Sequence, residues 1–416
     1  MEREEVERNQ RSRIYGAMIE SVAQRGYQKT TVAHVIALAG VSRRAFYELF
    51  PNKEHCLLGT YEIVVAQYRR RVLEAWLTER GWENRLHASC KTLLDDAGRD
   101  PKGPRLVLVD ALGIGQNARE RMQLAGSTFE RIVATALQLA PKEVVFPQLT
   151  SRAVVAGVRH VAFTRMLEGR HRELLGLTDE VLDWIGSYRL PPGGRLRTLT
   201  IAQPVRRPPA PAAFLIREDK RARVLGSVVH LTLDEGYAGL SDPQIAQFAG
   251  VSTEAFHRQF ANKEECFLAV IDEFVREAIE AVRPQMTSAD SWEEAVYNTI
   301  AAFVEHLAAR QALLRIAFVD LFEVGPGMIG RMTRAVDEFT TMLAERGPTP
   351  HRGPLIAREA VTGALWGIIS TFVSSNRLAR VPALVDHLTF TVLAPYIGSK
   401  ATIDVIAAAQ DRRGTG

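Results

Sequence analysis

The chain has 416 residues and a formal net charge of +4, and 46% of its residues are hydrophobic, as in ordinary globular proteins. That charge is too modest to identify a nucleic-acid partner, and the length predicts two or more domains, because one core seldom serves more than about 250–300 residues. The charged opening "MEREEVERNQ" and the short longest apolar run, Gly363–Val373, indicate neither a secretory signal nor a membrane span, so we expect a cytoplasmic protein.

The first predicted element is an amphipathic helix over Ile14–Gly26. Ile14, Met18 and Val22 share one face at helical spacing, and Gly26 is a usual helix stop. Similar helical patterns recur along most of the chain, and strand-like alternation is scarce. We therefore predict an all-α protein.

Residues 31–60 predict three helix starts in close succession. The side chains of Thr31, Ser42 and Asn52 suit helix N-caps, and Gly40 suits the left-handed turn that ends the first of these helices. A short helix, a glycine-containing turn and a second short helix form a helix-turn-helix, whose second helix can enter the major groove of DNA.

The second helix of this pair, "RRAFYELF", has two unlike faces. Phe46 and Phe50 are spaced to pack inward, so Arg43, Arg44 and Tyr47 point away from the core. Paired arginine donors match guanine edges, while hydroxyl and lysine groups suit phosphate oxygens. The DNA contacts expected from this segment are Thr31, Ser42, Arg43, Arg44, Tyr47 and Lys53. Two outward arginines also occur on merely solvated helix faces, so this segment alone leaves DNA binding open.

A proline- and arginine-rich stretch over residues 189–213 interrupts the helical pattern. It holds six prolines, five arginines and no acidic residue, which predicts an extended linker. Its arginines can touch DNA, or the stretch can be a solvated spacer.

Beyond the linker, the chain repeats itself. "AGVSRRAFYELFPNKEHCL" (Ala39–Leu57) returns as "AGVSTEAFHRQFANKEECFL" (Ala249–Leu268), and the same spacing of residues also pairs Asp110 with Asp320. A register kept over so long a stretch indicates a duplicated module. Cys56 and Cys266 also match, and we expect both to be small buried hydrophobes rather than disulfide or metal ligands.

The second copy differs where DNA contacts are expected. Glu254 replaces Arg44, His257 replaces Tyr47, and net charge falls from +4 over residues 11–60 to −2 over residues 221–270. A negative helix-turn-helix approaches phosphate less readily. Either this copy contacts DNA weakly, or it has become mainly structural. The residues available for such contacts are Ser252, Thr253, His257 and Lys263.

These residues together resemble the N-terminal domain of TetR-type transcriptional repressors. The "AGVS" turn, the recognition-helix aromatics and the Lys-Glu start of the next helix carry the resemblance over Ile14–Thr60 and again over Val224–Val270. It implies two modules, each a three-helix helix-turn-helix DNA-binding domain followed by a helical ligand-binding and dimerisation domain. The expected ranges are 1–60 and 61–188 for the first module, 189–213 for the linker, 214–270 and 271–400 for the second module, and 401–416 for a tail.

Because such repressors bind DNA as two-fold dimers, a tandem copy can act as an intramolecular pseudo-dimer. Small residues and apolar stripes make Arg152–Leu167, Arg358–Ser374 and Ala383–Gly398 candidates for a seam between copies, although they can also pack within each copy. Unequal recognition helices predict an asymmetric operator. Pairing of two whole chains stays open.

The resemblance also implies a small-molecule pocket in each helical domain. Apolar candidate residues suggest a hydrophobic effector, although the same residues fill ordinary cores. The candidates are Phe129, His160, Phe163 and Met166 in the first copy, and Phe318, Phe322, Met332, Phe339 and Trp366 in the second.

Two other function classes compete with a regulator. One is a helical ligand- or protein-binding module whose DNA-binding domains have decayed. The other is an enzyme, which we do not expect, because no phosphate loop, nucleophile elbow, HExxH or CxxC site is present. Asp110 and Asp320 are more easily helix caps or ion-pair partners, and no cofactor or metal is implied.

Overall fold

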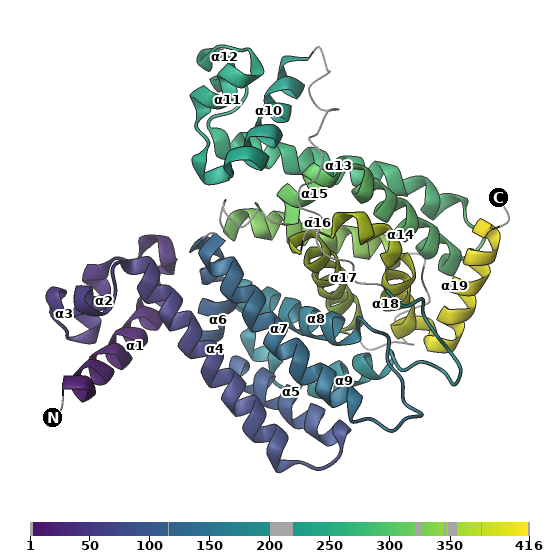
Figure 1. Ribbon diagram of the computed structural model, residues 1–416, viewed down its shortest axis with the longest axis horizontal. Helices are drawn as coiled ribbons and strands as arrows, with labels where there is room; N and C mark the ends of the chain where they lie inside the picture. Colours follow the sequence, from purple (N-terminus) through teal and green to yellow (C-terminus); the bar gives the residue numbers. More distant parts are fainter. Residues whose placement is uncertain are drawn as a thin grey trace. The chain divides into compact units, whose positions relative to one another are not determined.

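A computed structural model describes residues 3–114, 116–199, 219–318, 320, 324, 326–344, 347, 356–375 and 377–414. Regular structure in these residues is helical throughout, without strands, which confirms the all-α prediction (Figure 1). Within the same ranges, no helix combines the length and apolar character that crossing a membrane requires.

The first repeat begins with the predicted helix-turn-helix. Its helices are α1 (Arg3–Lys29), α2 (Val32–Ala39), α3 (Arg43–Leu49), α4 (Lys53–Thr78), α5 (Trp82–Arg99), α6 (Lys102–Leu108), η1 (Asp110–Ile114), α7 (Gln116–Gln138), α8 (Thr150–Leu167), η2 (His171–Leu174) and α9 (Thr178–Gly186). α1 starts earlier than predicted and is interrupted at Gly26, whose φ of 74° is the left-handed conformation expected of a glycine stop.

The second repeat follows the same order. Its helices are α10 (Lys220–Glu235), η4 (Tyr237–Gly239), α11 (Asp242–Ala249), α12 (Thr253–His257), α13 (Lys263–Ser288), α14 (Trp292–Ala309), α15 (Gln311–Phe318), α16 (Pro326–Ala344), α17 (Ala357–Ser374), η7 (Leu378–Leu384), α18 (Val385–Ile397) and α19 (Ser399–Gly414). α10 ends at Gly236, the residue that matches Gly26 of the first repeat.

The chain divides into two compact units, and the division does not follow the repeats. One unit comprises residues 1–142 and 158–183, and the other comprises residues 143–157 and 184–416. The second unit therefore holds two segments of the first repeat together with the whole second repeat. In the first unit, α4 packs on α5, while α1 packs on α2, α4 and α6.

Within the second unit, the N-terminal half of α8 lies against α17. A Cβ atom placed on Gly157 would lie 2.7 Å from the carbonyl oxygen of Ala360, and one placed on Gly367 would collide with the side chain of Ala156. Small residues thus let the two backbones approach closely. The contact joins a helix of the first repeat to a helix of the second.

The segment that follows α9 is also tied to the second repeat within this unit. The buried Tyr188 donates a hydrogen bond of 3.0 Å to the carbonyl oxygen of Thr391, and its ring lies 6.2 Å from that of Phe390, centroid to centroid. His387 Nε2 lies 3.0 Å from the carbonyl oxygen of Arg197. These contacts anchor residues 188–197 on α18.

The described part of the linker, residues 189–199, is irregular, as its composition predicted, but it is not wholly solvated. Leu190 and Leu199 are buried. The amide of Leu190 donates to the carbonyl of Val145 (2.8 Å), and Leu199 exchanges two hydrogen bonds with the side chain of Gln148. Residues 200–213 of the predicted linker lie outside the described residues.

Cys56 and Cys266 are free and fully buried, as predicted. Burial raises the pKa of each thiol to about 12, so both stay protonated at neutral pH. They fill core space at the start of α4 and α13.

Candidate nucleic-acid interface

The first helix-turn-helix domain comprises α1, α2, α3 and the start of α4, and its predicted caps are all present. The Thr31 hydroxyl accepts the amide of His34 at 3.3 Å, and His34 Nδ1 accepts the amide of Thr31 in return. Ser42 and Asn52 cap α3 and α4 in the same manner. Gly40 ends α2 with φ 60° and ψ 41°. Because each cap oxygen accepts a bond from its helix, the hydroxyl hydrogens of Thr31 and Ser42 are left to donate outward.

An aromatic core sets the angle between these helices. Phe46 and Phe50 are buried with ring centroids 5.7 Å apart, and Tyr15 of α1 packs against Phe50 at 5.6 Å. Arg13 of α1 donates to the carbonyl of Gly40 at 2.8 Å, which ties α1 to the turn between α2 and α3. Side chains of α1 therefore hold the recognition helix α3 and the turn before it.

The outer face of α3 carries the residues predicted to contact DNA. Arg43, Arg44 and Tyr47 are all exposed, as expected from their spacing. The Arg44 side chain is 89% exposed and pairs with Glu48 at 2.9 Å, an interaction of little strength in water. Arg43 lies over the Tyr47 ring, 5.9 Å from its centroid. Both guanidinium groups can thus reorient toward a groove.

The two matched lysines, Lys53 and Lys263, bond to backbone carbonyls within their own domains, and their contact with DNA stays a prediction. Lys53 Nζ donates to the carbonyl of Tyr27 at 3.1 Å and lies 4.1 Å from the centroid of its ring. Lys263 Nζ donates to the carbonyls of Tyr237 (3.2 Å) and Leu240 (2.8 Å). Lys53 thus ties the start of α4 to the end of α1, and Lys263 ties the start of α13 to η4 and the residue after it. Burial lowers the pKa of Lys53.

The second helix-turn-helix domain comprises α10, η4, α11, α12 and the start of α13, and its interior matches the first. Phe256 and Phe260 are buried 5.8 Å apart, Ser252 caps α12, and Arg221 lies over Phe260 as Arg11 lies over Phe50. The repeated residues therefore form the same local packing in both domains.

The outer face of α12 is chemically different. Thr253, Glu254 and His257 are exposed at the positions of Arg43, Arg44 and Tyr47. The pKa of Glu254 is lowered, first by a hydrogen bond from Ser252, so this carboxylate is charged at neutral pH. His257 Nε2 lies 3.8 Å from a carboxylate oxygen of Asp242 in α11.

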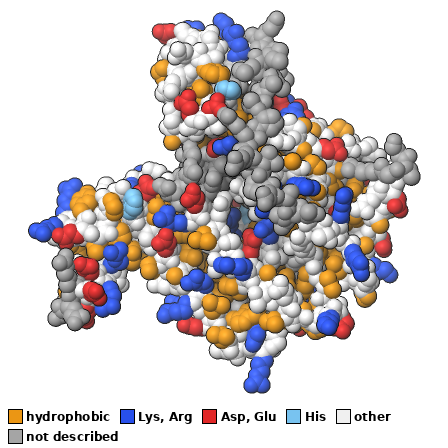
Figure 2. Space-filling model, in the orientation of Figure 1, with side chains coloured by type: hydrophobic (Ala, Val, Ile, Leu, Met, Phe, Trp, Pro, Cys, Tyr) orange, Lys and Arg blue, Asp and Glu red, His pale blue; other side chains and the backbone are white. Residues whose placement is uncertain are grey.

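Three site residues were missed at the sequence level. Arg11 and Arg13 recur as Arg221 and Arg223 at the repeat spacing, a signal that lay just before the first predicted helix. Asp242 replaces Val32, a substitution just outside the repeated phrase. On the visible face of the molecule, acidic and basic side chains are interspersed over the described residues (Figure 2).

Parts of this chain are similar to known proteins. A family model described as "Bacterial regulatory proteins, tetR family" matches residues 14–59 and again residues 229–270. The nucleoid occlusion factor SlmA of Serratia proteamaculans is 30% identical over 140 residues, which cover 33% of this chain and 69% of that protein. The chain belongs to the TetR family. Because the two matches fall in the two repeats, it contains two TetR-like modules and is a DNA-binding transcriptional regulator.

Other relatives have varied roles. The SlmA protein of Idiomarina loihiensis is 29% identical over 157 residues, 37% of this chain and 79% of that protein. The transcriptional activator FasR of Mycolicibacterium smegmatis is 23% identical over 148 residues, 34% of this chain and 68% of that protein. Among solved structures, the fatty acid degradation regulator FadR from Bacillus halodurans is 21% identical, with a TM-score of 0.38 over 42% of this chain and 96% of that chain.

In the first TetR-like module, α6 connects the DNA-binding domain to the helical domain. Lys102 of α6 pairs with Glu20 of α1 at 2.6 Å. Arg105 of α6 donates to the carbonyl of Met166 at the end of α8 (2.8 Å) and lies 3.7 Å from Asp110. Asp110 is buried, and burial raises its pKa to about 6. These contacts link the end of α8 to α6, and α6 to α1.

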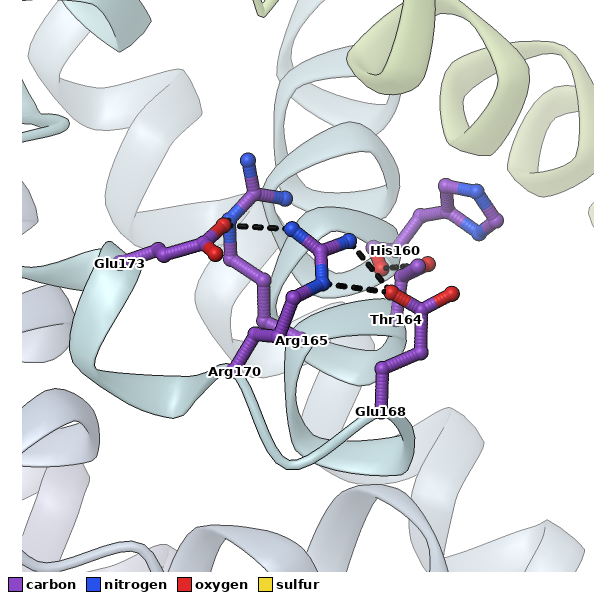
Figure 3. Close-up of polar contacts among 6 residues, drawn as sticks. All are labelled: His160, Thr164, Arg165, Glu168, Arg170 and Glu173. Atoms are coloured by element: carbon purple, nitrogen blue, oxygen red, sulfur yellow. Dashed lines mark hydrogen bonds and ion pairs between the residues drawn. The ribbon is translucent and has the colours of Figure 1, made fainter.

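A polar cluster holds the end of α8 (Figure 3). Arg170 donates to Glu168 and Glu173, and Arg165 lies 3.7 Å from Glu173. The Thr164 hydroxyl donates to the carbonyl of His160 at 3.0 Å. The cluster joins α8 to η2 and fixes the helix end that Arg105 contacts.

The predicted effector-pocket residues lie in the helical domains of the two TetR-like modules. Phe163 and Met166 are buried, and Phe129 and His160 are half-buried. In the second module, Phe318 stacks on Trp366 at 4.2 Å and Phe339 packs on Phe303 at 4.8 Å, while Met332 is buried. Phe322 lies outside the described residues. The pocket stays a prediction.

Proposed function

We propose that this TetR-family regulator is a ligand-responsive repressor that acts as an intramolecular pseudo-dimer on an asymmetric operator. The observation that supports it is the contact of α8 with α17 inside one compact unit. There Gly157 faces the Ala360 carbonyl, and Gly367 faces Ala156. Late helices of two TetR-like modules meeting through small residues can replace the association of two chains.

The anchored linker supports the same proposal. Tyr188, just after α9, is fully buried, and its hydroxyl is bonded to α18 of the second repeat. A simple spacer between independent modules would not require a buried aromatic side chain with a satisfied hydroxyl. The segment instead holds the end of the first repeat on the second.

Ligand response rests on the route from α8 through Arg105 and α6 to α1. A small hydrophobic molecule bound among the helical domains would favour one setting of α8 over another, and the DNA-binding domain would follow. No enzymatic step is part of this function.

The decisive experiment measures the mass of the chain by light scattering, free and bound to a duplex selected by the chain from a random pool. We expect one chain per duplex and a footprint with unequal halves. Two chains on a perfect palindrome would contradict the pseudo-dimer. A salt series on the same duplex should show affinity falling steeply as salt rises.

The direction of regulation needs a separate measurement. A reporter placed behind the selected operator should be expressed more strongly when the gene for this chain is removed. Lower expression after removal would assign activation instead.

A further inference from the structure

We infer that Asp242 closes the second helix-turn-helix domain to DNA, by placing the chain's own carboxylate where a DNA phosphate would bind. The inference rests on the proposed function in one respect, namely that the first helix-turn-helix domain binds the operator. It adds that, of the two unequal halves of the operator, only the half under the first domain is read by a recognition helix.

The contacts of Asp242 carry the inference. One carboxylate oxygen accepts the backbone amide of Lys263 at 2.8 Å, and the other lies 3.8 Å from Nε2 of His257. Lys263 is the first residue of α13, a helix of 26 residues, and His257 is an outward residue of α12. The carboxylate, whose side chain is 23% exposed, therefore sits between the recognition helix and the start of the next helix.

That position is one that a phosphate would otherwise use. Backbone amides at the start of a long helix point outward and favour negative charge, so they are common donors to DNA phosphates. In the second copy, such an amide already has an anionic acceptor. A phosphate arriving there would have to displace the carboxylate or lie beside it at short range, and the repulsion between like charges opposes both.

The first copy has no such group. The residue matching Asp242 is Val32, whose side chain cannot accept a hydrogen bond, and the residue matching Lys263 is Lys53. The helix starts are otherwise alike, since Asn52 and Asn262 cap them with the same 2.9 Å bond. The difference between Val32 and Asp242 thus separates a helix start without this carboxylate from one whose first amide already bonds to it.

The recognition helices strengthen the contrast. In α3 an ion pair joins Arg44 to Glu48. The matching residues of the second copy are Glu254 and Arg258, so the order of the two charges along the sequence is reversed. The acidic residue then lies in the first turn of α12, the end that a recognition helix directs toward bases. Two carboxylates, Asp242 and Glu254, therefore face the side where phosphates would lie.

The test introduces the aspartate of the second copy at the matching position of the first copy. Val32→Asp should weaken binding to the selected duplex about tenfold, because it places an anion beside a phosphate contact. Val32→Asn, of equal size but uncharged, should cost about threefold or less. Melting curves of both variants should match wild type, since an acidic residue in the first turn suits the helix dipole.

The possible results distinguish a failure of this inference from a failure of the proposed function. Wild-type affinity in Val32→Asp, or an equal loss in Val32→Asn, would overturn the inference. Failure of the wild-type chain to bind any duplex would instead overturn the proposed function.

A reciprocal experiment removes the carboxylates of Asp242 and Glu254 from the second copy. In a chain whose first copy is disabled by Arg43→Ala and Arg44→Ala, adding Asp242→Val and Glu254→Arg should raise affinity for a mixed-sequence duplex about tenfold at low salt. The gain should vanish as salt rises. No gain at low salt, with an unchanged melting curve, would overturn the inference.

Discussion

The two helix-turn-helix domains have the same interior and different surfaces. Their cap serines, buried phenylalanines and clamping lysines match one for one, whereas α3 carries two outward arginines and α12 carries Thr253 and Glu254. Interior residues are constrained by packing, and outward residues only by the partner they meet. A duplicated domain can therefore lose a binding surface and keep its fold.

The attachment of each domain to its helical domain differs as well. The pair between Glu62 and Arg121 in the first repeat returns as Asp272 and Arg331 in the second. The Lys102–Glu20 pair does not return, because the matching residues are Ala312 and His230. The described ion pairs thus join α6 to α1 only in the repeat that we expect to bind DNA.

The largest expected effect concerns the two surfaces directly. Replacing Arg43 and Arg44 by alanine should lower affinity for the selected duplex about a thousandfold, since each bidentate contact to guanine contributes about 1–3 kcal/mol. Thr253→Ala with Glu254→Ala should change it less than about threefold. Fluorescence anisotropy at fixed salt measures both. Equal losses would remove the distinction between the copies.

The contact between the repeats gives the next effect. Gly367→Leu should lower the free energy of unfolding by about 3 kcal/mol, because the new side chain collides with Ala156. Gly126→Ala, in α7 where a Cβ meets open space, should raise it by about 0.5–1 kcal/mol. Urea denaturation followed by tryptophan fluorescence compares them. A neutral Gly367→Leu would show that α8 and α17 are not packed in solution.

A pH-dependent effect on stability is expected at Asp110, which follows α6 in the first repeat. Burial raises the pKa of Asp110 from 3.8 to about 6, so the folded chain binds this proton more tightly than the unfolded chain. The contribution of Asp110 to the free energy of unfolding is therefore lost as the pH rises from about 4 to 6. The free energy of unfolding of Asp110→Asn, relative to wild type, should therefore rise by about 2 kcal/mol between pH 4.5 and pH 7. A difference that does not change with pH would contradict this assignment.

The smallest effect separates structure from binding at the matched lysines. Lys53→Met and Lys263→Met should each lower the free energy of unfolding by about 1–2 kcal/mol, because each removes charge-assisted bonds to backbone carbonyls. Only Lys53→Met should also weaken DNA binding. Denaturation and anisotropy on the same samples measure both properties, and an equal affinity loss in Lys263→Met would mean that the second copy binds DNA too.

Much of the helix-turn-helix could be predicted because its determinants are local. Caps such as Thr31 and Ser42 bond to amides three residues away, and Gly40 acts through its own backbone angles. The burial of Phe46 followed from helical spacing. The repeat then identified the same features a second time.

The remaining features depend on contacts distant in sequence. The carbonyl that Lys53 contacts is 26 residues away in the sequence, and no local pattern reveals that contact. Asp242 bonds to an amide 21 residues away, and only the folded turn brings the two together. The division of α8 between two units also has no local signal, since its helical pattern continues through Gly157.

The Gly157–Ala360 contact has a consequence for how the regulator would respond to its abundance in a cell. Partners joined in one polypeptide meet at an effective concentration set by their tether, so dilution does not separate them. Operator occupancy would rise with the first power of the number of chains, without the threshold that a dissociating dimer introduces.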